Sequence, residues 1–139
     1  MMSQDRIKCG LEEGQNQTVL HRTDPPENQT HYQSPLGIFY IHYDTTTVNG
    51  WDHQPLPGDE NNNGIPDFVE TTADMADSTY SVLVDRMGYD VQPPDEDGIY
   101  DIYIRDDLNP SWYGVTYWND NLNNGSSWIV IDNDFSPEE

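Results

Sequence analysis

The chain has 139 residues with 26 acidic and only 5 basic side chains, which gives a formal net charge of −21. This charge excludes a nucleic-acid backbone as a partner and disfavours an anionic membrane, because binding either requires a basic surface. The chain also contains no run of about 20 apolar residues, the length that spans a bilayer. Leu, Ile, Val and Phe together number 27. One small domain must therefore draw much of its core from aromatic side chains, and we expect it to be marginal without bound cations.

The first 34 residues are polar, and Pro25-Pro26 breaks any periodicity. They predict an extended arm in front of a single domain over 35–139. Within the arm, Val19-Leu20 is compatible with a short strand. The first residues lack the apolar segment of a signal peptide. Cys9 is the only cysteine, so no internal disulfide can form, and we interpret it as a bystander or as half of a bridge to another molecule.

Residues 38–43 predict the first strand, because β-branched and aromatic side chains fill it and a Thr-rich stretch ends it. His42 with Asp44, and the neighbours Asp52 and His53, are candidates for general acid–base catalysis or metal binding. A lone histidine in a strand is more often a hydrogen-bonded packing residue than a catalyst. Packing is therefore the favoured interpretation.

The segment 59–70 fills every constrained position of the calcium-loop pattern D-x-[DN]-x-[DN]-G-x5-E. Calcium takes about six to eight oxygen ligands, so such a loop turns alternate side chains inward, adds a backbone carbonyl and closes with a bidentate carboxylate. The sequence predicts a calcium ion held by Asp59, Asn61, Asn63, the carbonyl of Ile65, Asp67 and Glu70. The alternative is an Asn-Gly turn before an ordinary helix start, which accounts for Gly64 and Pro66 but not for the spacing of the rest.

A helix is predicted over 66–87, where apolar residues recur every three or four positions from Val69 to Met87. Gly88 follows as a C-terminal cap. Pro55 and Pro57 stand where a complete EF-hand has its entering helix, so no such helix is expected. Calcium sensors work by changing the angle between two helices. With a single helix, the ion is expected to act as a structural staple.

Three further strands are predicted over 100–105, 113–118 and 127–131, where apolar and aromatic side chains alternate between turn-rich stretches. The acidic segment 95–98 is interpreted as a turn rather than as a second ion site, because its glycine comes too early for the twelve-residue pattern. One long helix among short strands predicts an α+β fold, with a small mainly antiparallel or mixed sheet and the helix packed on one face. The order of the strands is not predicted.

Several aromatic residues are candidates for an exposed platform that stacks on sugars. A domain poor in aliphatic side chains needs such residues in its core first, so the core is the favoured interpretation. The residues concerned are Trp51, Trp112, Tyr113, Tyr117 and Trp118.

An ordered series of short segments resembles a known family. They are Ser34-Pro35, 39–46, 63–70 with its Asn-Gly-Ile-Pro-Asp string, 100–104, Tyr113-Gly114, and 129–135 with its Ile-Asp-Asn-Asp string. From about Cys9 to Phe135 the chain resembles the N-terminal part of a family of secreted bacterial zinc metalloproteases. The resemblance implies a zincin-like fold in which the strand near 127–131 edges the substrate cleft. It also implies a following zinc helix that carries His-Glu-x-x-His, with two zinc-binding imidazoles and a general-base Glu.

The sequence departs from that family at the catalytic motif. None of its histidines, which are His21, His31, His42 and His53, has a second histidine four residues away. No catalytic residue is therefore carried over, and zinc is expected only in a full-length relative. The chain is expected to be a partial member that holds the substrate-side half, with the catalytic half or a peptide substrate as its partner.

Two functions remain open at this stage. The first is a calcium-stabilised, non-catalytic N-terminal portion of a secreted zinc metalloprotease. The alternative is a stand-alone, calcium-dependent extracellular module that binds glycans or cell-surface partners. An acidic mimic of nucleic acid is disfavoured, because the aspartates are scattered evenly along the chain. An unpaired calcium loop binds weakly, and this predicts an extracellular location with millimolar calcium.

Overall fold

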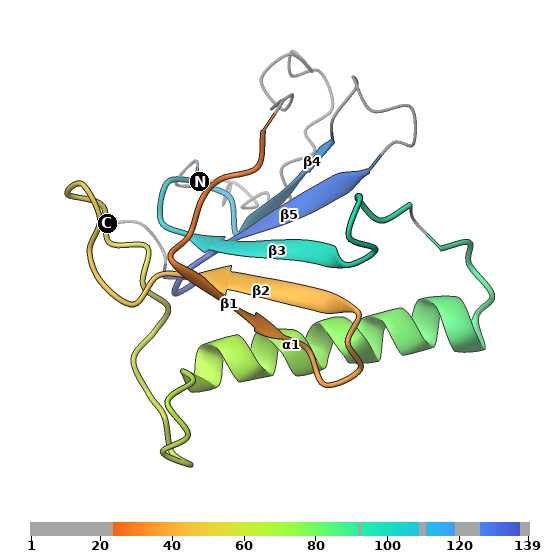
Figure 1. Ribbon diagram of the computed structural model, residues 1–139, viewed down its shortest axis with the longest axis horizontal. Helices are drawn as coiled ribbons and strands as arrows, with labels where there is room; N and C mark the ends of the chain where they lie inside the picture. Colours follow the sequence, from red (N-terminus) through yellow and green to blue (C-terminus); the bar gives the residue numbers. More distant parts are fainter. Residues whose placement is uncertain (1–23, 92, 109–110, 119–125, 137–139) are drawn as a thin grey trace, which may run out of the picture.

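The computed structural model describes residues 24–91, 93–108, 111–118 and 126–136, and for Trp118 the backbone only (Figure 1). Five strands form one sheet, and one long helix lies against it (Figure 1). The elements are β1 (Thr30–Gln33), β2 (Phe39–Tyr43), α1 (Asp67–Tyr80) with its π-helical continuation η2 (Ser81–Arg86), β3 (Tyr100–Arg105), β4 (Gly114–Trp118) and β5 (Ser127–Asp132). The predicted α+β fold is confirmed.

The sheet is mixed, with strand order β1-β2-β3-β5-β4. The three inner strands run parallel, and in register Ile41 lies beside Ile102, which lies beside Ile129. The two edge strands run antiparallel to their neighbours. Because β5 pairs with strands on both sides, it is not an edge. The outer strands are β1 and β4, so β5 is an inner strand, and the expectation that it edges a substrate cleft stays a prediction.

Helix α1 begins after Pro66 and packs on one face of β1 and β2. Its residues Val69 and Ala73 are fully buried against Ile41 and Ile104 of the sheet. This contact arises because residues four apart share one side of a helix and alternate residues share one face of a strand. Gly88 ends the helix with φ +75°, as predicted.

The other face of the sheet carries a second core, which is largely aromatic. Its buried members are Tyr103, Trp112, Val115, Tyr117, Trp128 and Val130. The prediction that aromatic residues serve as core is right for Trp112 and Tyr117. It is wrong for Trp51, which is 54% exposed. Aromatic side chains thus supply the apolar area that the few aliphatic residues cannot.

Two parts of the predicted chain organisation are corrected. Residues 30–33, predicted to lie in an unpacked arm, form β1 and pair with β2. The sequence Thr-His-Tyr-Gln has too little apolar character to signal a strand, and its pairing depends on the partner. The helix stripe predicted as far as Met87 is buried only in its first half, since Leu83 and Met87 are exposed. Val19-Leu20 and Cys9 lie outside the described residues.

Candidate metal centre

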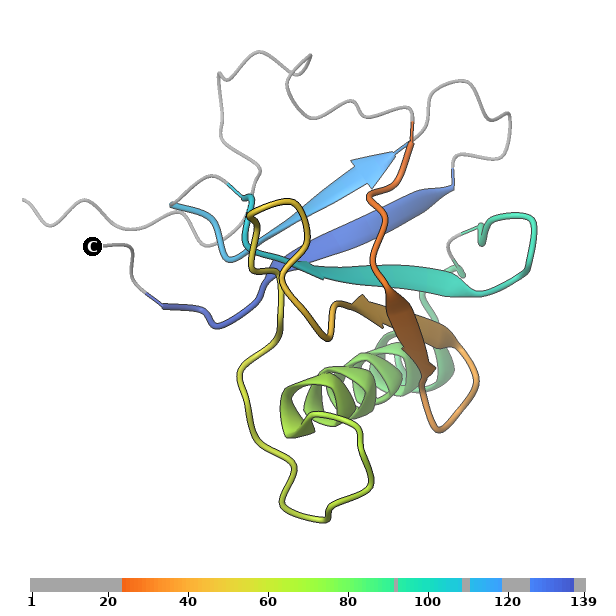
Figure 2. The same cartoon turned by 60° about the vertical axis from the view of Figure 1, so that its left-hand side comes forward.

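The predicted calcium loop lies between a long connection from β2 and the first turn of α1 (Figure 2). Asn62 and Gly64 take left-handed backbone angles, with φ of 55° and 84°. The backbone N–H of Asp67 donates to the carbonyl of Gly58 at 2.8 Å and closes the loop. Such positive φ values favour Gly and Asn, which explains their places in a loop this tight.

Side chains at alternate positions of the loop are held by backbone N–H groups. Asp59 accepts hydrogen bonds from the N–H groups of Asn63 at 3.1 Å and Gly64 at 2.8 Å. The side-chain oxygen of Asn61 accepts from the same Asn63 N–H at 3.1 Å. The side-chain oxygen of Asn63 accepts from the Ile65 N–H at 2.8 Å. Asx turns of this kind fix side-chain direction without any bound ion.

Glu70, on the first turn of α1, closes this cluster. Its Oε1 accepts from the amide of Asn63 at 2.6 Å, and its Oε2 accepts from the amide of Asn61 at 3.2 Å. The structure therefore brings together four of the predicted ligand residues, Asp59, Asn61, Asn63 and Glu70. Two acidic groups in the first helical turn, Asp67 and Glu70, also complement the helix dipole.

The other two predicted ligands are Asp67 and the carbonyl of Ile65, and their role as ligands stays a prediction. Both carboxylate oxygens of Asp67 accept from the backbone N–H of Glu60, at 3.1 and 3.3 Å. Asp67 therefore ties the helix start to the opening of the loop. The side chain of Ile65 packs against the core beneath α1.

The donor set suits calcium only if amide oxygens take part. Among the described residues, no group of three or more His, Cys, Asp or Glu side chains could hold a metal ion. Asn61 and Asn63 supply oxygens, and each carbonyl oxygen has two lone pairs, so one is left after it accepts a backbone N–H. Their NH2 groups occupy the approach to Glu70, so an incoming cation must replace these two hydrogen bonds. Calcium accepts amide oxygens readily, whereas zinc favours Cys and His.

The other acidic loop behaves as a turn, in line with the favoured interpretation. Asp95 accepts from the N–H of Asp97 at 3.1 Å, and Asp97 accepts from that of Ile99 at 2.9 Å. Gly98, with φ +81°, completes it. Burial, followed by the hydrogen bond with Asp97, raises the pKa of Asp95 to about 6.

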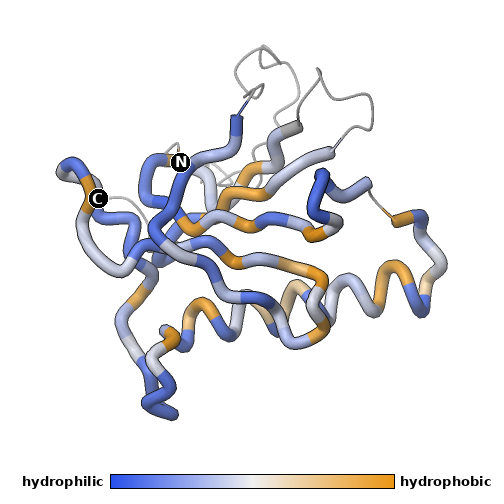
Figure 3. Tube along the Cα trace, in the orientation of Figure 1, coloured by the Kyte–Doolittle hydropathy of each residue, from blue (hydrophilic) through white to orange (hydrophobic). Residues whose placement is uncertain are grey.

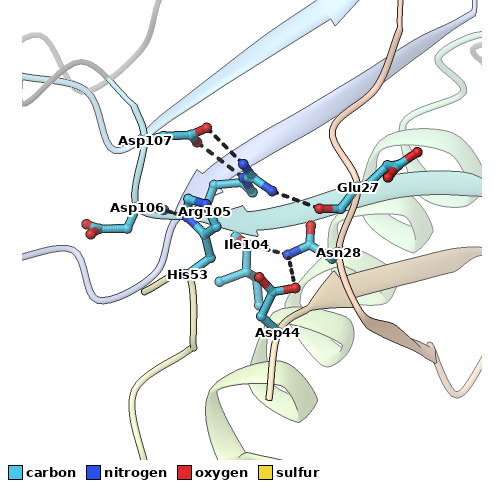
Figure 4. Close-up of polar contacts among 8 residues, drawn as sticks. All are labelled: Glu27, Asn28, Asp44, His53, Ile104, Arg105, Asp106 and Asp107. Carbon is cyan, nitrogen blue, oxygen red and sulfur yellow. Dashed lines mark hydrogen bonds and ion pairs between the residues drawn. The ribbon is translucent and has the colours of Figure 1, made fainter. Parts of the chain in front are cut away.

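His42 forms a 2.6 Å contact with Asp101 on the neighbouring strand and stacks on Tyr103 with ring centroids 4.3 Å apart. Its partner is not Asp44. That carboxylate is buried and accepts from the side-chain amide of Asn28 at 3.1 Å (Figure 4). The strand histidine is thus a packing residue with a cross-strand partner.

His53 is buried, and its Nδ1 accepts from the backbone N–H of Asp106 at 3.0 Å (Figure 4). Burial lowers the pKa of His53, and the positive charge of Arg105 lowers it further. Asp52 makes its hydrogen bonds with Gln54. The histidine is therefore a neutral packing residue rather than an acid–base partner of Asp52.

Sequence reasoning missed an acidic group at the carboxyl ends of the three parallel strands. Each of these strands ends in or is directly followed by an aspartate, namely Asp44, Asp106 and Asp132. Burial, followed by the charge of Asp134, raises the pKa of Asp132 to about 6. The same two causes raise the pKa of Asp106. The signal was an aspartate closing each strand, but it had no meaning until the strands were known to be parallel.

Arg105 holds this end of the sheet together. It donates to both carboxylate oxygens of Asp107, at 2.9 and 3.3 Å, and to the carbonyl of Glu27 at 2.8 Å (Figure 4). The contact with Glu27 joins the segment before β1 to the end of β3. Arg105 is therefore a structural clamp.

Comparisons with protein-family models, with curated proteins and with solved structures found no match. The resemblance to zinc metalloproteases therefore stays a prediction. Within the part of the chain that the structure describes, no helix is both long and apolar enough to cross a membrane.

Proposed function

We propose that this chain is a calcium-stabilised, non-catalytic module in which an ion bound at 59–70 fastens the start of α1. The observation that carries the proposal is the convergence of Asp59, Asn61, Asn63 and Glu70 on one another. A divalent cation would neutralise the carboxylates of Asp59 and Glu70 in a chain whose net charge is −21.

A staple fits the surroundings of the loop better than a switch does. On one side, the N–H of Leu56 donates to the carbonyl of Asn133 at 3.2 Å, which anchors the chain before the loop. On the other side, Val69 and Ala73 are fully buried. Because both ends of the loop are anchored, a bound ion cannot change the angle between two elements as it does in a calcium sensor. Its binding energy adds to the stability of the fold.

We further propose that the module is the non-catalytic part of a secreted zinc metalloprotease. The ordered segments that resemble that family support this. No hydrolytic step is assigned to any residue here. Zinc, the general base and the second half of the cleft would belong to a partner or to a longer chain, and an extracellular location would supply the calcium.

A calcium-dependent binding module for glycans is the second candidate. Trp51 favours it, because this residue is more than half exposed and stacks on His53 with ring planes 5° apart. A rigid, exposed indole is a suitable surface for a sugar ring. A glycan-array signal that disappears with chelator and with Trp51→Ala would support this candidate, and an array without signal would exclude it.

Thermal unfolding tests the staple directly. We expect the melting temperature to rise by several degrees in calcium over chelator, since ligand at about 100 times its dissociation constant adds about 2.7 kcal/mol. Magnesium at equal concentration is the control, and it should do less because it dehydrates reluctantly. Equal melting temperatures in calcium and chelator would contradict the proposal.

A further inference from the structure

A large apolar groove, with a volume of about 970 Å³, lies between the helix and the sheet. It is separate from the cluster of loop side chains that closes on Glu70. Apolar residues of the helix form one wall, and the helix-facing side of β5 with the segment after it forms the other. Hydrophobic positions recur along the helix when the trace is coloured by hydropathy (Figure 3). The apolar residues used below are Met75 and Leu83 on the helix, Ile129 and Ile131 on β5, and Phe135.

The groove is open because one helix is too narrow for this sheet. Five strands spaced about 4.8 Å apart span roughly 19 Å, whereas a helix packs at about 10 Å. Helix α1 lies beneath β1 and β2, and among the described residues no second helix lies beneath β5 and β4 (Figure 2). Ile129 is accordingly 36% exposed although it belongs to an inner strand. The uncovered area is the width of one further helix.

Charge restricts what can fill it. Three aspartates, Asp67, Asp90 and Asp101, are among the residues that line the groove, and neither of the described arginines is. The carboxylate of Asp101 is paired with His42 at 2.6 Å, so the negative charge at the groove comes from the other two. A second copy of this chain also carries a net charge of −21 and would be repelled. The occupant must therefore be apolar on one side and basic at its margins.

An extended peptide is a poorer fit than a helix. The groove is lined by side chains from the face of β5, and the backbone of that strand is already paired on both sides. The strand that lines the groove has no free edge, so a peptide lying in the groove could not pair with it. A helix satisfies its own backbone and needs only an apolar surface.

We propose that this groove binds an amphipathic helix of a partner protein, with an apolar stripe and Lys or Arg flanks, laid beside α1 beneath β5. The helix completes the second layer of the fold. Asp67 lines the groove and is also a predicted calcium ligand, but none of the four side chains grouped in the loop, Asp59, Asn61, Asn63 and Glu70, lines it. Variants at Met75 and at Glu70 therefore test the two proposals separately.

The test uses the full chain and three labelled peptides of about 18 residues, long enough to span roughly 27 Å as helices. The first has a Leu stripe with Lys flanks, the second has the same composition with the stripe scrambled, and the third has Glu in place of Lys. Fluorescence anisotropy should detect binding of the first only. Binding should weaken with added salt, since part of it comes from the carboxylates.

Two matched variants locate the site. Met75 lines the groove and is 64% exposed, whereas Met87 is 59% exposed and does not line it. Met75→Glu should weaken binding of the first peptide at least about tenfold, because a charge replaces an apolar contact. Met87→Glu adds the same charge and should leave binding unchanged, and both variants should keep the melting temperature.

Several outcomes would overturn the proposal. These are no binding by the Lys-flanked peptide, equal binding by the scrambled or the Glu-flanked peptide, and equal loss in both methionine variants. Sedimentation is measured in parallel. A dimer that Met75→Glu dissociates would assign the groove to a second copy and would also overturn the proposal.

Discussion

Glu70 Oε1 accepts a 2.6 Å hydrogen bond from the side-chain amide of Asn63, and this bond joins the middle of the loop to the first turn of α1. The carboxylate at the last position of the calcium pattern thus contacts the side chain at the fifth position directly. Preorganisation of this kind lowers the entropy lost when an ion binds. The same bond ties the loop to the helix through side chains. An ion that replaces it would therefore change only the residues around it.

Asp77 links α1 to the turn between β1 and β2, and its removal should destabilise the fold. It is only 5% exposed, and its Oδ2 accepts from the backbone N–H of Leu36 at 2.8 Å. Asp77→Ala leaves that N–H without its acceptor, so urea unfolding should show a loss of roughly 1–3 kcal/mol. Asp77→Asn keeps an acceptor without a buried charge and should lose less. Asp74→Ala, at an exposed position of the same helix, is the control, and equal losses at both positions would refute this role.

Asp132 should make the fold more stable as the pH falls from about 7 to about 4. Its pKa is about 6 in the folded protein, raised first by burial and then by Asp134, and roughly 3.9 when unfolded. Between these values the folded state holds a proton that the unfolded state has lost, so stability decreases as pH rises through this window. The contribution is roughly 1–2 kcal/mol, reduced from the full linkage value because the side chain is partly exposed.

Asp132→Asn checks this sign. The variant should be more stable than the parent at pH 7 and should lose part of the slope in the free energy of unfolding between about pH 4 and 6. Asp85→Asn makes the same charge change at an exposed position and should leave the slope unchanged. If the stability of both the parent and Asp132→Asn did not change with pH over this range, the buried carboxylate would be ruled out as a source of pH dependence.

His53 should make the fold less stable as the pH falls, which is the opposite of the effect of Asp132. Burial and the charge of Arg105 lower its pKa below the ordinary value. The unfolded state therefore takes up a proton near pH 6.5 before the folded state does, and stability falls as the pH drops through this value. His53→Asn retains an acceptor for the Asp106 N–H and should remove this slope. His31→Asn, at an exposed position of β1, is the control, and an unchanged slope in His53→Asn would disprove the assignment.

The secondary structure could be predicted where the pattern is local. Alternation predicts β3 and β5, and the three- and four-residue repeat with Gly88 predicts the helix. The spacing of the pattern also brings Asn61 and Asn63 to Glu70, because loop geometry depends on neighbours in the chain. Asp67 was assigned to the ion, but its nearest partner is the Glu60 N–H, which a spacing pattern does not include.

The features that depend on distant residues could not be predicted. Parallel pairing of β2 with β3 joins residues about 60 positions apart, and no local pattern encodes it. The same holds for β1, which becomes a strand only beside β2. Leu83 and Met87 fit the apolar helical pattern whether or not the sheet covers them. Their exposure depends on how far the sheet extends over the helix, which the pattern does not contain.

Calorimetric titration with calcium, combined with thermal unfolding, is the most direct test of the calcium staple. Glu70→Gln is compared with Glu60→Gln, an identical change at an exposed loop position that the calcium pattern leaves free. The parent and Glu60→Gln should bind calcium and melt at a higher temperature with it. Glu70→Gln should bind at least about tenfold more weakly, because it loses the bidentate carboxylate. No heat at millimolar calcium with a melting curve indifferent to chelator, or equal weakening in both variants, would contradict the account.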